Sequence, residues 1–201
     1  CQRNSVGHSC KNDTPDENAQ ARERAAVLLD VANAVGGLVV GTGDLSEEAL
    51  GFCTFSGDHI ANYNVNVCIP KTVLRELTRH VAESGRVPGV AEVVQDILDT
   101  PVSPELLPPE ESGEIHQKTE VIPGPYPLHD FFLYYFVKYR FRPSKLYYYA
   151  CMAFADTHDP AIIKEKLALF LRRFCAAQFK RACAPDSASI TDVNLNGVNF
   201  Y

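Results

Sequence analysis

Residues 36–51 read GGLVVGTGDLSEEALG, and this stretch decides the fold class. The glycine pair at its start ends a helix predicted over residues 18–35, where apolar side chains recur at helical spacing. The apolar run at residues 38–40 then predicts a short strand, buried on both faces of a parallel sheet. A helix, a strand and a polar loop make one unit of an α/β fold. Ligands of such folds gather beyond the carboxyl ends of strands, so we expect the chemistry to begin at Gly41.

Helices dominate the rest of the chain. LSEEALGF favours a short helix after Asp44, and GDHIANYNVNV is predicted to be a polar loop. Further helices are predicted by KTVLRELTRHVAESG, VPGVAEVVQDILD, the aromatic PLHDFFLYYFVKYRF, and DPAIIKEKLALFLRRFCAAQFKRAC. The first carries a stripe expected in the core: Val73, Leu74, Leu77 and Val81. One aromatic set is expected to pack rather than bind: Phe131, Phe132, Tyr134, Tyr135, Phe136 and Tyr139. Residues 100–127 are predicted to form a long loop and a candidate lid.

Composition is typical of a soluble globular protein with one domain, since 46% of the 201 residues are hydrophobic and 22% are charged. The net charge of -6 argues against a general nucleic-acid partner, and no apolar run approaches the roughly 20 residues that span a membrane. The seven cysteines lack the spacing of a disulfide scaffold or zinc site, so we expect reduced thiols and a cytoplasmic protein. The start lacks a signal peptide and an initiator methionine, which we interpret as an interior cut.

The loop after the predicted strand gathers hydroxyls and carboxylates: Thr42, Asp44, Ser46, Glu47 and Glu48. Glycine permits close backbone approach, a threonine hydroxyl binds phosphate, and carboxylates supply oxygen ligands for magnesium. The pattern therefore suits a triphosphate with magnesium. A capped turn explains it equally well, because Asp44 or Ser46 can be the N-cap of the helix that follows.

Three weaker candidates lie elsewhere. Lys71, at a helix start, faces the positive end of the helix dipole and favours a bound anion, although an exposed surface lysine is the plainer alternative. The FKR run at residues 179–181 can hold an anionic ligand or simply favour the end of a helix. Asn18 and Arg22 share one helix face, and a cap with an internal ion pair explains them as well.

Eight motifs resemble, in the same order, the synthetase domain of glutamine-dependent NAD⁺ synthetases. They are ENAQARER, GGLVVGTGDLSEEALGFCTFSGDH, YNVNVCIPKT, ILDTPVSPELLPP, GEIHQKTE, LHDFFLYYF, FRPSK and QFKRAC, and they cover nearly the whole chain. The resemblance implies a three-layer Rossmann-like α/β domain of the adenine-nucleotide α-hydrolase type, present in part, with a helical C-terminal part. We expect residues 1–201 to be the C-terminal part of the ATP-dependent amidating domain.

In that family ATP adenylates the nicotinate carboxylate of deamido-NAD⁺, and ammonia then displaces AMP. The resemblance thus implies a ligase that forms a carbon–nitrogen bond and uses ATP and Mg²⁺. It assigns ATP contacts to Thr42, Lys71 and Ser103, and a magnesium contact to Glu47. It assigns deamido-NAD⁺ contacts to Asn18, Arg22, Glu47, Phe52, Cys53, Thr54, Phe55 and Lys180. The expected partners are deamido-NAD⁺, ATP and ammonia from a glutaminase domain, with a homo-oligomer at full length and neither nucleic acid nor membrane.

The chain also departs from the family's pattern. An SGGxDS pyrophosphate loop and a nitrilase-like glutaminase domain, both expected upstream of Cys1, are not among these residues, and the family runs on past the position of Tyr201. We therefore expect the 201 residues alone to be inactive. Phe52 stands where the family commonly has Trp, and its ring can still stack. Two other functions stay open: another adenylating amidotransferase of this fold, against which FCTF and QFKR argue, and a non-catalytic nucleotide-binding paralogue.

Overall fold

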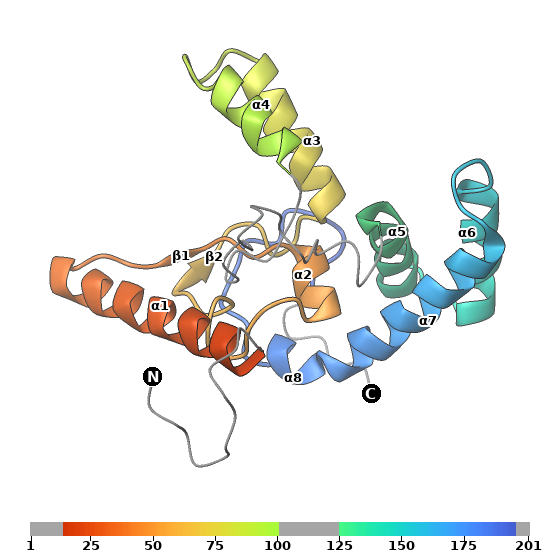
Figure 1. Ribbon diagram of the computed structural model, residues 1–201, viewed down its shortest axis with the longest axis horizontal. Coiled ribbons are helices and arrows are strands. Elements are labelled where there is room, and N and C mark those ends of the chain that lie inside the picture. Colours follow the sequence, from red (N-terminus) through yellow and green to blue (C-terminus); the bar gives the residue numbers. More distant parts are fainter. Residues whose placement is uncertain (1–13, 101–124, 196–201) are drawn as a thin grey trace, which may run out of the picture.

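A computed structural model describes residues 14–100 and 125–195 of the protein (Figure 1). Its elements are α1 (Thr14–Val35), β1 (Val40–Gly41), α2 (Leu45–Leu50), β2 (Tyr63–Asn64), α3 (Lys71–Glu83), α4 (Ala91–Asp99), α5 (Tyr126–Val137), α6 (Pro143–Ala153), α7 (Pro160–Ala176) and α8 (Gln178–Arg181). Ser103 and most of the predicted lid lie outside the described residues.

The sheet of the described residues is small. β1 pairs in parallel with β2, with Val40 opposite Tyr63, and Asn64 also forms a parallel bridge to Ser187. The strand predicted at residues 38–40 is present only in part, since β1 comprises Val40 and Gly41. The prediction that it is buried on both faces is wrong, because Val40 is 51% exposed. Burial on both faces requires helices against both faces, and none of the described helices packs on β1. The segment predicted as a polar loop contains β2, whose two residues are too few to show an alternating pattern.

The hydrophobic core lies among the helices. Short α2 sits in the middle of the molecule and contacts α3, α5, α7 and α8 (Figure 1). The largest side chains of this core are fully buried: Leu45, Leu128, Phe132, Leu146, Ile163, Phe170 and Phe174. The aromatic set of α5 packs as predicted; the ring centroids of Phe131 and Tyr135, for example, are 4.6 Å apart. Tyr139, at the edge of this set, is half exposed.

Most predicted helices are confirmed, with changes at their ends. α1 begins at Thr14 rather than at residue 18. The long C-terminal helix predicted to reach Cys183 is interrupted at Ala177, where α7 gives way to the single turn of α8. α6 was not predicted, although Leu146 and Ala150, its two buried residues, lie four positions apart; apolar and aromatic residues on its other sides hide this spacing.

The prediction of a core stripe on α3 is wrong. Val73, Leu77 and Val81 are all exposed, and Val73 shows 50% of its surface. Figure 1 shows α3 and α4 leaving the rest of the molecule side by side, so that only the start of α3 approaches α2 and α5. The stripe is apolar as the sequence indicates, but α4 is the one described helix that lies along its length.

Five cysteines of the described residues are free thiols: Cys53, Cys68, Cys151, Cys175 and Cys183. Among the same residues, no helix combines the length and apolar character that crossing a membrane requires.

Gly51 tests how tightly α2 packs against the helices that follow. This residue ends α2 with a φ of 70°, and a Cβ on it would lie 2.7 Å from the Cβ of Ala177. We predict that Gly51→Ala lowers the free energy of unfolding by about 2–4 kcal/mol, from the left-handed backbone and from overpacking together. Urea unfolding of the complete protein measures this change.

Gly85→Ala is the matched control. Gly85 has a φ of 65°, but a Cβ there would meet nothing within 4 Å. Only the backbone penalty of about 1–2 kcal/mol is therefore expected. Equal losses in the two variants would contradict the close contact between Gly51 and Ala177.

Candidate functional site at the two ends of helix α2

A reciprocal capping box opens α2. The Asp44 carboxylate accepts hydrogen bonds from the backbone N–H groups of Ser46, at 3.0 Å, and Glu47, at 2.9 Å. In return, Glu47 Oε2 accepts the backbone N–H of Asp44 at 3.2 Å. The cap that the sequence offered as an alternative is therefore present, with Asp44 as the N-cap. It leaves Glu47 Oε1 facing outward from the cap, toward Lys71.

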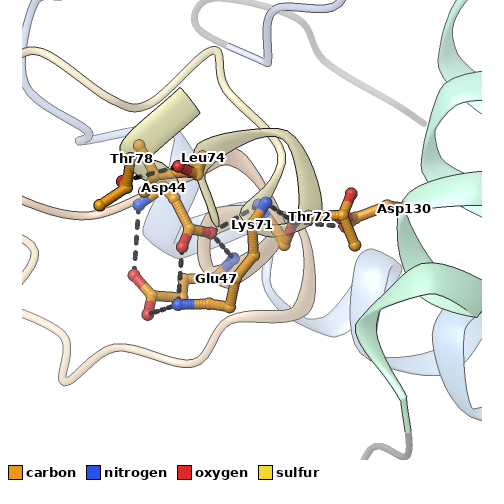
Figure 2. Close-up of polar contacts among 8 residues, drawn as sticks. Asp44, Glu47, Lys71, Thr72, Leu74, Thr78 and Asp130 are labelled. Carbon is orange, nitrogen blue, oxygen red and sulfur yellow. Dashed lines mark hydrogen bonds and ion pairs between the residues drawn. The ribbon is translucent and has the colours of Figure 1, made fainter. Parts of the chain in front are cut away.

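Lys71 joins this cap from the start of α3 (Figure 2). Its ammonium lies 2.7 Å from Asp44 Oδ2 and 2.8 Å from Glu47 Oε1, and 5.2 Å from the centre of the Tyr126 ring. Its side chain is only 14% exposed, so the alternative of an exposed surface lysine is wrong. Burial alone would lower the pKa of Lys71, but the two carboxylates outweigh it and raise the pKa, which keeps the ammonium charged. Two carboxylates thus hold one fixed cation at the edge of the cap.

Basic side chains donate hydrogen bonds to the carbonyl groups at the C-terminal end of α2. Arg173 donates to the carbonyl of Leu50 at 3.4 Å, and buried Arg181 donates to that of Ala49 at 3.2 Å. Lys180 donates to the carbonyls of Gly51, at 2.8 Å, and Cys53, at 2.5 Å. The last carbonyls of a helix lack partners within it, and cations suit the negative end of its dipole. The alternative that the FKR run favours the end of a helix is confirmed, since Lys180 and Arg181 lie in the last turn of α8, and the structure adds contacts with the end of α2. An anionic ligand at this run stays a prediction.

Residues 52–55 follow this end of α2 and are bound by three side chains, two from α1 and one from α8. Thr54 donates its hydroxyl to Asn18 Oδ1 at 2.9 Å, and Arg22 Nε donates to the carbonyl of Phe55 at 3.2 Å. Because α1 begins at Thr14, the alternative that Asn18 is its cap is wrong. Lys180 supplies the third hold, through the carbonyl of Cys53. Two segments remote in sequence, α1 and α8, thus meet at one loop.

The rings of this loop lie beside basic and aromatic groups. The Arg173 guanidinium stands 4.2 Å from the centre of the Phe52 ring, a cation–π distance. Phe55 is exposed, and its ring centre lies 5.4 Å from that of Phe179. Burial raises the pKa of the Cys53 thiol to about 12, which leaves it a poor nucleophile.

The structure thus brings most of the predicted site residues into two groups, one at each end of α2. Glu47 and Lys71 form the first group. The second group comprises Asn18, Arg22, Phe52, Cys53, Thr54, Phe55 and Lys180. Thr42 lies exposed between β1 and the cap, apart from both groups.

Sequence reasoning missed three residues that shape these groups. Asp130 and Tyr126, from α5, contact the start of α3 and the Lys71 ammonium, and Arg173 contacts the end of α2. All three belong to helices whose pattern indicates packing, so no local signal marks them. The one sequence signal was the aspartate among the apolar residues of LHDFF, because a carboxylate on an apolar helix requires a partner.

Glu47 was predicted to bind magnesium. Its carboxylate keeps lone pairs beyond those that meet Asp44 and Lys71, and its side chain is partly open to solvent. Among the described residues, no group of three or more His, Cys, Asp or Glu side chains could hold a metal. Magnesium commonly uses only one or two carboxylates and takes its other ligands from phosphate and water, and Glu47 fits that role.

Comparison with known proteins gives a consistent result. A model described as NAD synthase matches residues 2–150. Glutamine-dependent NAD(+) synthetase of Mycobacterium tuberculosis (strain ATCC 25618 / H37Rv) is 39% identical in an alignment 198 residues long, which covers 89% of this chain and 29% of that protein. The enzyme of the same description from Acinetobacter baylyi is 36% identical over 96 residues, covering 48% of this chain and 17% of its own. The chain therefore spans less than a third of the length of these relatives.

Solved structures show the shared fold. A glutamine-dependent NAD(+) synthetase from Cytophaga hutchinsonii superposes with a TM-score of 0.64 at 19% identity, over 90% of this chain and 26% of that one. NMN synthetase from Francisella tularensis gives 0.52 at 21% identity, over 84% of this chain and 54% of its own. The predicted α/β class agrees with these neighbours and with the small parallel sheet. The three-layer arrangement stays a prediction.

Glu48 gives the site a pH dependence that can be measured. Its side chain faces Arg181 and is 9% exposed; burial raises its pKa to about 7, and Arg181 opposes the rise. Because the folded protein binds this proton more tightly, the stabilisation is complete below pH ~4.5 and is lost as the pH rises through about 7. The loss is at most about 3 kcal/mol.

We predict that Glu48→Gln, which cannot ionise, gains in melting temperature relative to the wild type between pH 5 and pH 8. Thermal unfolding of both proteins at the two pH values checks this. A difference in melting temperature that stays constant with pH would show that Glu48 does not titrate in this range.

Proposed function

Because this chain belongs to the NAD synthase family, we propose that it supplies part of the ATP-dependent amidating site of a glutamine-dependent NAD⁺ synthase. The observation that carries the proposal is the convergence at residues 52–55. Asn18 and Arg22 of α1 and Lys180 of α8 contact this one loop, from two segments that are far apart in the sequence. They are also the positions that the resemblance matches to deamido-NAD⁺. A shared binding site would explain why α1, α8 and this loop meet.

The contacts of the loop support a role in placing the dinucleotide. Lys180 and Arg22 bind backbone carbonyls, so they fix the course of the chain without engaging the side chains of the loop. Phe55 and Phe179 present exposed rings, and the Lys180 ammonium lies 6.0 Å from the centre of the Phe179 ring. Aromatic faces beside a cation suit a ligand that combines flat rings with phosphates.

At the other end of α2, Lys71 is placed to receive the phosphates of ATP. Its charge is held in place by Asp44 and Glu47, which leaves a fixed ammonium next to a carboxylate. A phosphate oxygen of bound ATP would pair with the Lys71 ammonium beside Asp44 and Glu47. Glu47 would hold magnesium, which offsets phosphate charge when bound. Thr42, just before the cap, is a further ATP contact in this proposal. Ser103 is proposed from the resemblance alone.

The proposed reaction has two steps. An oxygen of the nicotinate carboxylate bonds to the α-phosphorus of ATP, and pyrophosphate leaves. The ammonia nitrogen then bonds to the carboxyl carbon, AMP leaves with the electrons of the carbon–oxygen bond, and the nitrogen loses a proton. Lys71 would stabilise charge on the phosphates in the first step, and the 52–55 loop would hold the dinucleotide in both.

The remaining predictions belong to the same proposal. Residues 1–201 would be the C-terminal part of the amidating domain, and the ammonia would come from a glutaminase domain. A cytoplasmic location and assembly into a homo-oligomer complete it. The size of the curated relatives leaves room for such further parts, since the chain covers 29% of the mycobacterial enzyme.

Glu47→Gln tests the ATP end of the site. Gln keeps the size of the side chain and can still accept the N–H of Asp44, but it loses the charge that pairs with Lys71. We predict that the complete protein loses ammonia-dependent NAD⁺ formation by about 100-fold or more in kcat/KM. Glu165→Gln, an exposed change on α7, is the control and should retain activity. Near-normal turnover by Glu47→Gln would remove Glu47 from the site.

Lys180→Met tests the dinucleotide end. Met keeps an unbranched side chain but cannot donate to the carbonyls of Gly51 and Cys53. We predict that KM for deamido-NAD⁺ rises about tenfold, because two hydrogen bonds from a charged donor are lost and the loop loosens. Lys164→Met, exposed on α7, serves as the control. An unchanged KM for deamido-NAD⁺ would show that the loop does not bind this substrate.

A further inference from the structure

One buried carboxylate without a role so far lies directly behind Lys71. Asp130 of α5 is 7% exposed. Its Oδ2 accepts the Thr72 backbone N–H at 3.0 Å and the Thr72 hydroxyl at 2.6 Å, and its Oδ1 accepts the hydroxyl of Ser46. Figure 2 shows the carboxylate pointing at Thr72, at the start of α3. Burial raises the pKa of Asp130, and these donors oppose the rise because they favour the ionised form.

These contacts supply a cap that α3 lacks in its own sequence. The residue before α3 is Pro70, which has no side chain able to cap it. The first two N–H groups of α3 are bound from elsewhere: Lys71 N–H by Ser46 Oγ at 2.9 Å, and Thr72 N–H by Asp130. A carboxylate at this position also suits the positive end of the α3 dipole. The place where α3 begins is therefore fixed by α5 and α2.

The same carboxylate reaches both residues of the Lys71–Glu47 pair through their sequence neighbours. Ser46 donates to Asp130 and accepts from the backbone of Lys71, and Ser46 is the residue before Glu47. Tyr126 lies one helical turn before Asp130 on α5, and its ring stands 5.2 Å from the Lys71 ammonium. Two residues of α5 therefore contact the surroundings of Lys71: Asp130 binds the backbone at the start of α3, and Tyr126 lies beside the ammonium group.

We propose that Asp130 is a positioning residue of the ATP site, which fixes where the Lys71 side chain leaves α3 and so keeps its ammonium beside Asp44 and Glu47. Asp130 need not touch ATP for this role. A lysine side chain has four rotatable bonds, so a defined position of its head requires a defined position of its backbone. The inference rests on the proposed function, in which Lys71 receives the phosphates.

The test is Asp130→Asn in the complete protein. The amide oxygen can still accept from Thr72, but the charge is lost and the amide NH₂ group faces the Ser46 hydroxyl. NAD⁺ formation from ammonia is measured with ATP varied and then with deamido-NAD⁺ varied. The KM for ATP is expected to rise about tenfold, while the KM for deamido-NAD⁺ stays within about twofold.

Two further variants separate positioning from stability. Ser46→Ala removes the bridge between Asp130 and Lys71, so its KM for ATP should rise, and the double variant should rise no further than the larger single effect. Thr191→Val is the control. The Thr191 hydroxyl, in the C-terminal tail, contacts the carbonyl oxygen of Cys68 at 2.6 Å and that of Val193 at 3.0 Å, and the substitution removes it. It should lower the melting temperature and leave the KM for ATP unchanged.

Asp130→Asn with a lowered melting temperature and an unchanged KM for ATP would overturn the proposal, since a purely structural role predicts that result. Effects of Asp130→Asn and Ser46→Ala that multiply fully would also overturn it. A wild type that forms no NAD⁺ would contradict the proposed function instead. Calorimetric titration with a non-hydrolysable ATP analogue then decides separately on Asp130: a tenfold weaker affinity in the variant supports the proposal, and equal affinity overturns it.

Discussion

The structure depends on how the two ends of α2 are bound. This helix has six residues, far fewer than the roughly 12–15 that an isolated helix needs for marginal stability in water. It exists because Leu45, Ala49 and Leu50 are buried and because charged groups satisfy its backbone at both ends. Acidic groups bind the N–H end and basic groups bind the carbonyl end, as the helix dipole favours. Without these partners, a buried helix of this length would leave its end groups unsatisfied.

The two groups of predicted residues are linked by this same helix. The first group binds its beginning through Glu47 and Lys71, and the second binds its end through Lys180 and the loop that follows. A helix rises about 1.5 Å per residue, so α2 sets a fixed spacing between the two ends. Such a fixed spacing would suit the proposed reaction, which requires a nucleotide and a dinucleotide to be held in a defined relative position.

Much of this arrangement could be predicted from the sequence, and the rest could not for physical reasons. Periodicity found α1, α3, α4 and α5, and the residue types before the helix offered Asp44 or Ser46 as the N-cap of α2, of which Asp44 is the one observed. Periodicity reports that a face is apolar and not what covers it, which is why the stripe on α3 was misplaced in the core. The roles of Asp130 and Arg173 arise from contacts between remote helices, which no local pattern contains. The residues of the 52–55 loop were found through resemblance rather than through their own chemistry.

Lys180 and Arg181 bind the end of α2 and the residues that follow it, and the type of contact affects how this part of the sequence can change. Both donate to main-chain carbonyls, which every amino acid carries. The side chains of Phe52 and Cys53 can therefore vary without loss of these hydrogen bonds, whereas Ala49 and Leu50 are constrained by their burial in the core. Gly51 has no such freedom, because the contact with Ala177 leaves no room for a side chain. Hydrogen bonds to the backbone thus permit substitutions at Phe52 and Cys53, while the contact with Ala177 requires glycine at residue 51.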